Sequence, residues 1–286
     1  MKYGLNQPFW VHNKVICNMA RAKRHYLPGQ VWHLTHRCHK REFLLKFRKD
    51  RQSWMQWLYE AKKRYGLVIF NYTVTSNHIH LLVLDAGDRH VIPRSMQLLA
   101  GRVGQEHNQR KSRKGAFWED RYHATAVEKG EHLCRCLVYL DLNMVRAGVV
   151  SHPAEWEHGG YNEIQQPRQR KSLIHYDALC SYLGIGNHEH MRESHREWVE
   201  DALKAKSHSR EEMWTQSIAV GSRDFTETIK EALGVLAKGR KLRESETAYE
   251  LREPPSLYEH DFAGEKEGLS EENAYFLDNY EEISGE

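Results

Sequence analysis

The chain has 286 residues, of which 40% are hydrophobic and 28% are charged, and its formal net charge at pH 7 is +3. This composition predicts a water-soluble protein with a hydrophobic core and room for one large domain or two small ones. It argues against a membrane-spanning protein, because no apolar run reaches the ~20 residues that a transmembrane helix needs.

The N-terminal region, residues 1–23, is expected to be an irregular extension of the chain. It lacks the apolar stretch at the centre of a signal peptide, so we expect a cytoplasmic protein. Met19 begins a basic run, Met19-Ala20-Arg21-Ala22-Lys23-Arg24, which would also serve as a natural start. The five cysteines have scattered spacing without a paired C-x-x-C, which favours neither a disulfide framework nor a zinc ribbon.

The segment from residue 24 to about residue 148 is predicted to interleave strands and helices. Asp50 is placed to cap a helix, Gly66 to end it, and a short turn at Ser76-Asn77 predicts an antiparallel hairpin. The expected elements are a strand at 30–37, a helix at 50–65, strands at 67–75 and 78–85, a helix at 89–109, a strand at 122–127 and a helix at 131–146. This order predicts an α+β fold with helices packed on an antiparallel sheet.

The segment after residue 150 has a different character. Loops and a short helix are expected at 150–185, and amphipathic patterns predict helices at 190–206 and 222–237. From Glu244 onward there are 14 Asp and Glu but two Lys and Arg, a local charge of −12, so the remaining 243 residues carry +15. We expect the acidic tail to be disordered and the basic body to bind a polyanion, with nucleic acid first in line.

Two histidines stand two residues apart in the predicted strand that contains Asn77-His78-Ile79-His80. Side chains alternate along a strand, so His78 and His80 share one face while Ile79 faces the core. Two neutral imidazoles on a rigid strand form half of a site for a divalent metal ion. A His-triad nucleotide hydrolase would need a third histidine at position 82, where this chain has a leucine.

Other histidines are interpreted as ordinary polar residues. His33 and His36 have odd spacing and fall on opposite faces of the first strand, so we do not expect them to be ligands. His188 and His190 flank a glutamate in a helix or loop, and we expect both to be solvated.

The helix predicted at 131–146 carries the candidate that completes the metal half-site. Tyr139 and Asn143 are four residues apart and share a face. The opposite face carries residues suited to the core, namely Leu133, Leu137, Leu140 and Met144. A tyrosine in this place could instead be a core residue whose hydroxyl finds a hydrogen-bond partner.

A basic loop follows the helix at 89–109. Its cationic residues are Arg110, Lys111, Arg113 and Lys114. Cations at the end of a helix suit the helix dipole, and they suit contacts to DNA phosphates equally well. We therefore keep both interpretations.

Together these motifs resemble the single-tyrosine HUH transposases, and most closely the REP-associated tyrosine transposases. The resemblance rests on the triplet His78-Ile79-His80, on Phe117-Trp118-Glu119-Asp120-Arg121-Tyr122, and on Tyr139-Leu140-Asp141-Leu142-Asn143-Met144-Val145-Arg146-Ala147-Gly148. It runs from about residue 24 to residue 161. It implies a ferredoxin-like HUH endonuclease core at 24–165, an accessory, mostly helical region at 166–240 and the tail at 241–286.

The resemblance also implies roles for single residues. His78, His80 and Asn143 would hold Mg²⁺ or Mn²⁺, Tyr139 would be the nucleophile, and Arg121 would join the basic loop in binding DNA. Many members have a proline after the asparagine, whereas this chain has Met144, which predicts a straighter helix. The expected partner is single-stranded or hairpin DNA, which implies association with the nucleoid. A monomer and a homodimer fit equally well.

The residue types suit this chemistry, but two other functions stay open. A metal ion polarises a phosphodiester, and a tyrosine phenolate attacks the phosphorus to give a covalent phosphotyrosine and a free 3′-hydroxyl. One alternative is a domesticated protein that binds DNA hairpins without cutting them. The other is a metal-dependent hydrolytic nuclease, whose cleavage would survive the loss of Tyr139.

Overall fold

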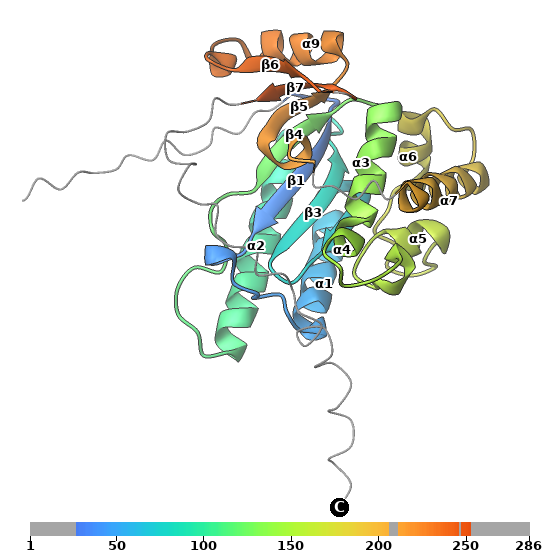
Figure 1. Cartoon of the computed structure of the whole chain (residues 1–286). Coiled ribbons are helices and arrows are strands. Elements are labelled where there is room, and N and C mark those ends of the chain that lie inside the picture. Colours follow the sequence, from blue (N-terminus) through green and yellow to red (C-terminus); the bar gives the residue numbers. More distant parts are fainter. Residues whose placement is uncertain (1–26, 206–210, 246, 253–286) are drawn as a thin grey trace, which may run out of the picture.

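The computed structural model describes residues 27–205, 211–245 and 247–252, and these form a seven-stranded sheet with helices on both faces (Figure 1). The strand order is β2-β3-β1-β4-β5-β7-β6. The strands are β1 (Val31–Arg37), β2 (Val68–Val74), β3 (His78–Leu84), β4 (His123–Val127), β5 (Ser217–Gly221), β6 (Lys241–Glu244) and β7 (Tyr249–Arg252). All neighbours are antiparallel except β4 and β5. The predicted α+β class is confirmed.

The predicted hairpin is present as β2 and β3. Its turn is closed by Thr75, whose hydroxyl oxygen accepts hydrogen bonds from the backbone amides of Asn77 (3.3 Å) and His78 (3.1 Å). β3 then pairs on its other side with β1, where Thr35 lies opposite His80 and Arg37 opposite His78. The register therefore places His78 and His80 on an inner strand of the sheet, on the face that they share with Thr35 and Arg37.

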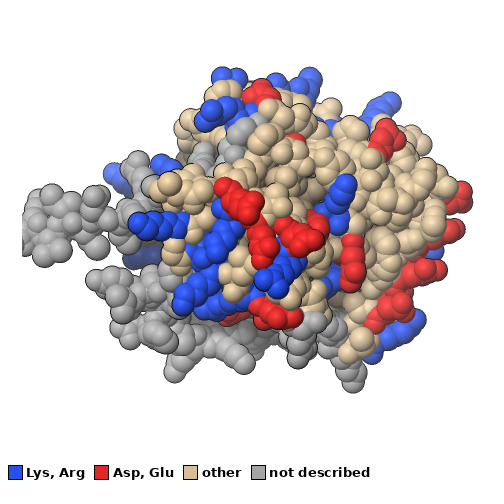
Figure 2. All heavy atoms as spheres, turned by 90° about the horizontal axis from the view of Figure 1, so that it is seen from above, with Lys and Arg blue, Asp and Glu red and all other residues tan. Residues whose placement is uncertain are grey.

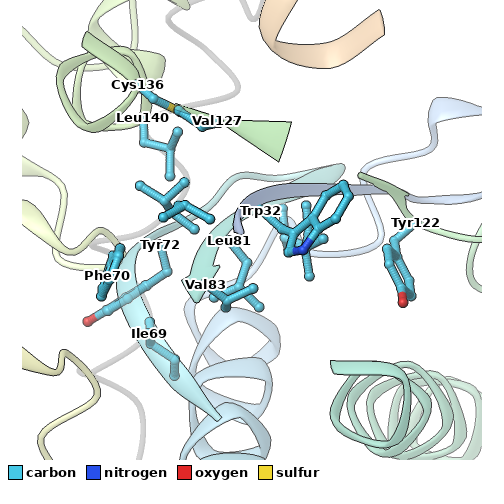
Figure 3. Close-up of a cluster of buried hydrophobic side chains, with 14 of the residues drawn as sticks. Trp32, Ile69, Phe70, Tyr72, Leu81, Val83, Tyr122, Val127, Cys136 and Leu140 are labelled. Carbon is cyan, nitrogen blue, oxygen red and sulfur yellow. The ribbon is translucent and has the colours of Figure 1, made fainter. Parts of the chain in front are cut away.

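Helices cover the two faces of the sheet unequally. They are α1 (Arg48–Tyr65), α2 (Val91–Arg110), α3 (Glu131–Asp141), α4 (Asn143–Arg146), α5 (Tyr161–Gln165), α6 (Tyr176–Leu183), α7 (His188–Lys204), α8 (Met213–Gln216) and α9 (Arg223–Leu233). Figure 1 shows α1 and α2 behind the sheet and α3 in front of it. In Figure 3, Cys136 and Leu140 of α3 lie on one side of the strands, and Trp32 and Val83 lie on the other.

The core extends to both faces of β3. Ile79, Leu81 and Val83 are fully buried toward α1 and α2, as the alternation predicts. His80 is also 98% buried, because α3 crosses the opposite face of the strand. The imidazole face is thus not an open surface but the floor of a site covered by a helix.

The accessory region contains more strand than the sequence predicts. The helix expected at 222–237 is present as α9, with the hydroxyl of Ser222 accepting from the amide of Phe225 at 3.2 Å. The apolar run at 217–221, however, forms β5 beside β4. β6 and β7 fall within 241–252, which was expected to be part of a disordered tail. The rest of the tail, and the predicted extension at 1–23, lie outside the described residues.

Two further observations concern predictions from composition. Among the described residues, the cysteines at positions 38, 134, 136 and 180 are free thiols. Within the part of the chain that the structure describes, no helix is both long and apolar enough to cross a bilayer.

Candidate active site

One cavity brings together the four residues predicted as nucleophile and ligands. It has a volume of about 500 Å³ and is lined by His78 and His80 of β3, Tyr139 of α3 and Asn143 of α4. Arg121, predicted to bind DNA, lines the same cavity. The histidines and Tyr139 are about sixty residues apart in the sequence, so their convergence is a property of the fold.

The ring of His78 is held from its Nδ1 side. Nδ1 lies 2.7 Å from Oδ1 of Asn77 and 3.0 Å from the hydroxyl oxygen of Thr75. That hydroxyl donates to the carbonyl of His78 at 2.8 Å, so toward the ring it acts as an acceptor. With Nδ1 donating to these oxygens, Nε2 is the nitrogen of His78 that carries the lone pair.

The ring of His80 is held from both nitrogens. Nδ1 lies 2.9 Å from Nε2 of His33, and Nε2 lies 3.0 Å from the amide nitrogen of Asn143. An amide NH₂ group donates, so Nε2 of His80 accepts and carries the lone pair. The lone pair and Asn143 therefore meet at one point of the cavity.

His33 is more than the ordinary polar residue predicted from its spacing. Its side chain is fully buried beneath α3, with Nδ1 2.8 Å from the carbonyl oxygen of Trp214. Burial lowers the pKa of His33 from 6.5 to about 3, against the opposing effect of the Trp214 hydrogen bond. The sequence signal that could have found it is its register: His33 pairs with Leu82, two residues from His80 on the same face.

The stability of the protein should depend on pH through His33. The unfolded chain binds a proton near pH 6.5 whereas the native imidazole does so near pH 3, so stability falls as the pH drops through this window. For one group the slope is at most about 1.4 kcal/mol per pH unit. Urea denaturation without added metal should show a steeper loss for the wild type than for His33→Gln between pH 6.5 and pH 4. Parallel curves would mean that His33 is charged in the native state.

Tyr139 is 95% buried and lies beneath a cation. The guanidinium carbon of Arg146 is 4.1 Å from the centre of the phenol ring, and Nη2 of Arg146 donates to the Tyr139 carbonyl at 2.5 Å. The phenol ring is 6.0 Å from the ring of His80. A positive charge at this place stabilises a phenolate and a phosphate alike, although sequence reasoning did not select Arg146 as a site residue.

The tyrosine helix is interrupted, contrary to the straighter helix predicted from Met144. α3 ends at Asp141, Leu142 has φ −78° and ψ 5°, and α4 begins at Asn143. Side chains use the carbonyls near the break: the hydroxyl of Thr73 donates to the Leu140 carbonyl at 2.9 Å. The break therefore has a cause other than a proline, and it places Asn143 at the start of a new helical turn.

The end of α3 is anchored by a buried charge. The carboxylate of Asp141 accepts from the amide of Asn71 at 3.0 Å and from Nε2 of His195 at 2.7 Å. Asn71 belongs to β2 and His195 to α7, so the turn after Tyr139 is tied to the sheet and to the accessory region. These contacts fix the height of Tyr139 above the histidines.

The four residues of the basic loop lie outside the set that lines the cavity, as far as the described residues show. Arg110 forms an ion pair with Asp50 of α1, and Arg113 one with Glu42 at 3.3 Å. Nζ of Lys111 lies 4.7 Å from the ring centre of Phe47, and Lys114 is exposed. The helix-end interpretation thus fits Arg110 and Arg113 well, while contacts of this loop to DNA stay a prediction.

At the end of the molecule that carries α9 and β6, basic residues are mixed with acidic ones. Figure 2 shows the end that carries α9 and β6, where Lys and Arg side chains lie beside Asp and Glu side chains. Arg223 and Glu227, for example, are 2.9 Å apart. At this end the described residues of both signs therefore lie side by side.

Asp50 should be important for stability because it organises this region. Its carboxylate is nearly fully buried, accepts from the amide of Phe47 at 3.3 Å and pairs with Arg110. Asp50→Asn removes the charge and should lower the free energy of unfolding by about 1–3 kcal/mol. Urea denaturation measures this. Asp201→Asn, in an exposed pair with Lys204, is the control and should change it by less than about 0.5 kcal/mol.

The donor set fits a divalent cation. The two histidines that line the cavity each carry the lone pair on Nε2, and rotation of the Asn143 amide would add its oxygen as a third ligand. Among the described residues, no group of three or more His, Cys, Asp and Glu side chains is arranged to hold a metal. His188 and His190 are exposed on α7, and Nε2 of His188 lies 2.7 Å from Asp177.

Comparisons with known proteins give one family match and two similar solved structures. Residues 29–140 match the family model described as "Transposase IS200 like". Among solved structures, the chain is similar to a REP-associated tyrosine transposase bound to a REP hairpin, with 15% identity, a TM-score of 0.44 and coverage of 56% of this chain and 96% of that one. It is also similar to a putative transposase from Deinococcus radiodurans, with 20% identity, a TM-score of 0.30 and coverage of 41% and 92%. No curated protein matches the chain.

The family match covers the segment that holds the histidine pair, Arg121 and Tyr139, and it ends three residues before Asn143. The matched segment includes β1 to β4 and most of α3. Residues 29–140 of this chain are therefore similar to the IS200-like transposase family.

Proposed function

We propose that this transposase cuts and rejoins single-stranded or hairpin DNA through a covalent bond between Tyr139 and a 5′-phosphate. The observation that carries the proposal is the common cavity of Tyr139, His78, His80 and Asn143. A nucleophile, two imidazole lone pairs and an amide within one cavity are the groups that a phosphodiester transfer requires. The motif from Tyr139 to Gly148 supports placement among the REP-associated tyrosine transposases.

Separate side chains of the protein act as nucleophile and as charge-stabilising groups in this reaction. The hydroxyl oxygen of Tyr139 loses its proton and attacks the phosphorus, the bond from phosphorus to the 3′-oxygen breaks, and the 3′-oxygen leaves as a hydroxyl after taking up a proton. Arg146 stabilises the phenolate and Arg121 neutralises the phosphate backbone. Attack by another 3′-hydroxyl reverses the step, so joining needs no ATP.

A bound Mg²⁺ or Mn²⁺ would supply a Lewis acid for the scissile phosphate, held by Nε2 of His78, Nε2 of His80 and the amide oxygen of Asn143. The rings are already oriented for this by their Nδ1 partners. Imidazole ligands favour Mn²⁺ over Mg²⁺ in affinity.

The test uses the full chain, Mn²⁺ and a pool of hairpin-forming single strands labelled at either the 5′ or the 3′ end. The expected product is a protein–DNA adduct that survives SDS and carries the 3′ label, together with a released 5′-labelled fragment that ends in a hydroxyl. An adduct with the 5′ label would reverse the polarity of the proposal. Cleavage without an adduct would indicate a hydrolytic nuclease, and binding without cleavage a regulator.

A further inference from the structure

A chain of hydrogen bonds runs from the accessory region to the histidine pair. It begins at the backbone carbonyl of Trp214 in α8, passes through the ring of His33 in β1 and ends at the ring of His80 in β3. The two links are 2.8 Å and 2.9 Å long. The ring centres of His33 and His80 are 5.1 Å apart and their planes differ by 17°. The rings therefore meet edge to edge, almost in one plane, as an in-line N–H···N bond requires.

The Trp214 carbonyl determines which ring nitrogens of His33 and His80 carry a proton. A carbonyl oxygen can only accept, so Nδ1 of His33 carries a proton. A fully buried neutral imidazole has one N–H group, so Nε2 of His33 is an acceptor. The proton between the rings then belongs to Nδ1 of His80, and the lone pair of His80 lies on Nε2, toward Asn143.

The Trp214 carbonyl is itself firmly placed. The indole ring is fully buried, and its nitrogen donates to Glu211 at 3.1 Å. The hydroxyl of Thr125 in β4 donates to the same carbonyl at 3.3 Å. α8 has four residues, and in this short helix the Met213 carbonyl accepts from the Ser217 amide while the Trp214 carbonyl accepts from side chains.

We propose that His33 is a positioning residue that sets the tautomer and ring orientation of His80, and that Trp214 of the accessory region sets His33 in turn. The proposal rests on His80 being a ligand in the proposed function. His78 has the equivalent support from Asn77 and Thr75, which lie one and three residues before it in the sequence. His80 has His33 as its direct partner, and His33 is held in turn by Trp214, which is 134 positions from His80 and outside the family-matched segment. Metal-ligating histidines commonly depend on such partners.

The first test is the tautomer of His80 in the metal-free full-length protein, read from ¹⁵N–¹H long-range NMR correlations of the histidine rings. We expect His33 and His80 both to carry the proton on Nδ1. A proton on Nε2 of His80, or two protons on His33, would overturn the proposal. This measurement needs neither DNA nor catalysis. The tautomers can therefore agree with the positioning proposal even if the protein does not cut DNA, and they can contradict it even if the protein does.

The second test compares two variants of His33. His33→Gln keeps a donor for the Trp214 carbonyl and an acceptor for His80, whereas His33→Phe fills the space without either. Mn²⁺ affinity, measured by electron paramagnetic resonance of the free ion, should fall about 10- to 100-fold in His33→Phe and be largely retained in His33→Gln. In His33→Phe the ring of His80 should show both tautomers, while His78 stays unchanged as an internal control.

Equal Mn²⁺ affinity in the wild type and in a folded His33→Phe would overturn the proposal, and so would equal losses in both variants. Circular dichroism establishes that each variant is folded. If His33→Phe does not fold, the wild-type tautomers and the affinity of His33→Gln still decide the outcome.

Discussion

Replacing Tyr139 by phenylalanine is expected to abolish the SDS-stable protein–DNA adduct and to lower strand cleavage on the order of 10⁴-fold or more, because the substitution removes the attacking oxygen. The ring and its contact with Arg146 remain, so folding should be preserved. DNA affinity, measured by mobility shift, should be roughly unchanged. The assay is denaturing electrophoresis of end-labelled hairpin DNA.

The control for this substitution is Tyr182→Phe. The hydroxyl of Tyr182 has a long contact of 3.5 Å to the carbonyl of Gly29, and its residue is not among those that line the cavity in the described structure. This variant should form the adduct at the wild-type level. An adduct that persists in Tyr139→Phe would assign the nucleophile to another residue.

Replacing His80 by alanine should remove metal binding and strand cleavage together. The substitution deletes one of two imidazole ligands and also the partner of Asn143. We expect a loss of Mn²⁺ affinity of more than about 100-fold, which exceeds the effect of removing a supporting partner. Calorimetry measures the affinity, and the adduct assay measures cleavage.

His123→Asn serves as the matched control for His80→Ala. His123 lines the same cavity, but its Nε2 faces the carbonyl of Ser217 at 2.9 Å. It should keep Mn²⁺ affinity within a few-fold of the wild type. Cleavage by His80→Ala at the wild-type rate in the presence of chelator would show that the reaction uses no metal held by these histidines.

The convergence of the four candidate residues in one cavity could be predicted because they lie on regular elements. A period of two places His78 and His80 together, and a period of four places Tyr139 and Asn143 together. The resemblance of the motif around Tyr139 to the tyrosine transposases then indicates that the histidine pair and the Tyr139–Asn143 pair belong to one site. The hairpin that carries the histidines was predictable from the short turn at Ser76-Asn77.

Residues whose roles depend on distant partners could not be predicted. His33 has a role through the Trp214 carbonyl, 181 residues away, and backbone carbonyls carry no sequence signal. Arg110 looked available to DNA because its partner Asp50 lies in another helix, 60 residues away. The break at Leu142 depends on the Thr73 hydroxyl, which reaches α3 from β2.

The C-terminal strands were missed for a different reason. The charge of the last 43 residues, dominated by acidic side chains, favoured disorder for the whole segment. Within it, however, Leu251 is fully buried between β5 and β6. A strand of four residues with one buried apolar side chain has too little pattern to stand out from such a composition.

The pairing of β4 with β5 has a consequence for how this protein can be divided. A fragment that ends near residue 165 would keep the cavity residues but lose β5, leaving β4 as an unprotected edge strand. Unpaired edges recruit other chains, so such a fragment should self-associate. The segment that carries the cavity residues and the accessory region therefore share one sheet, which extends beyond the family-matched residues 29–140.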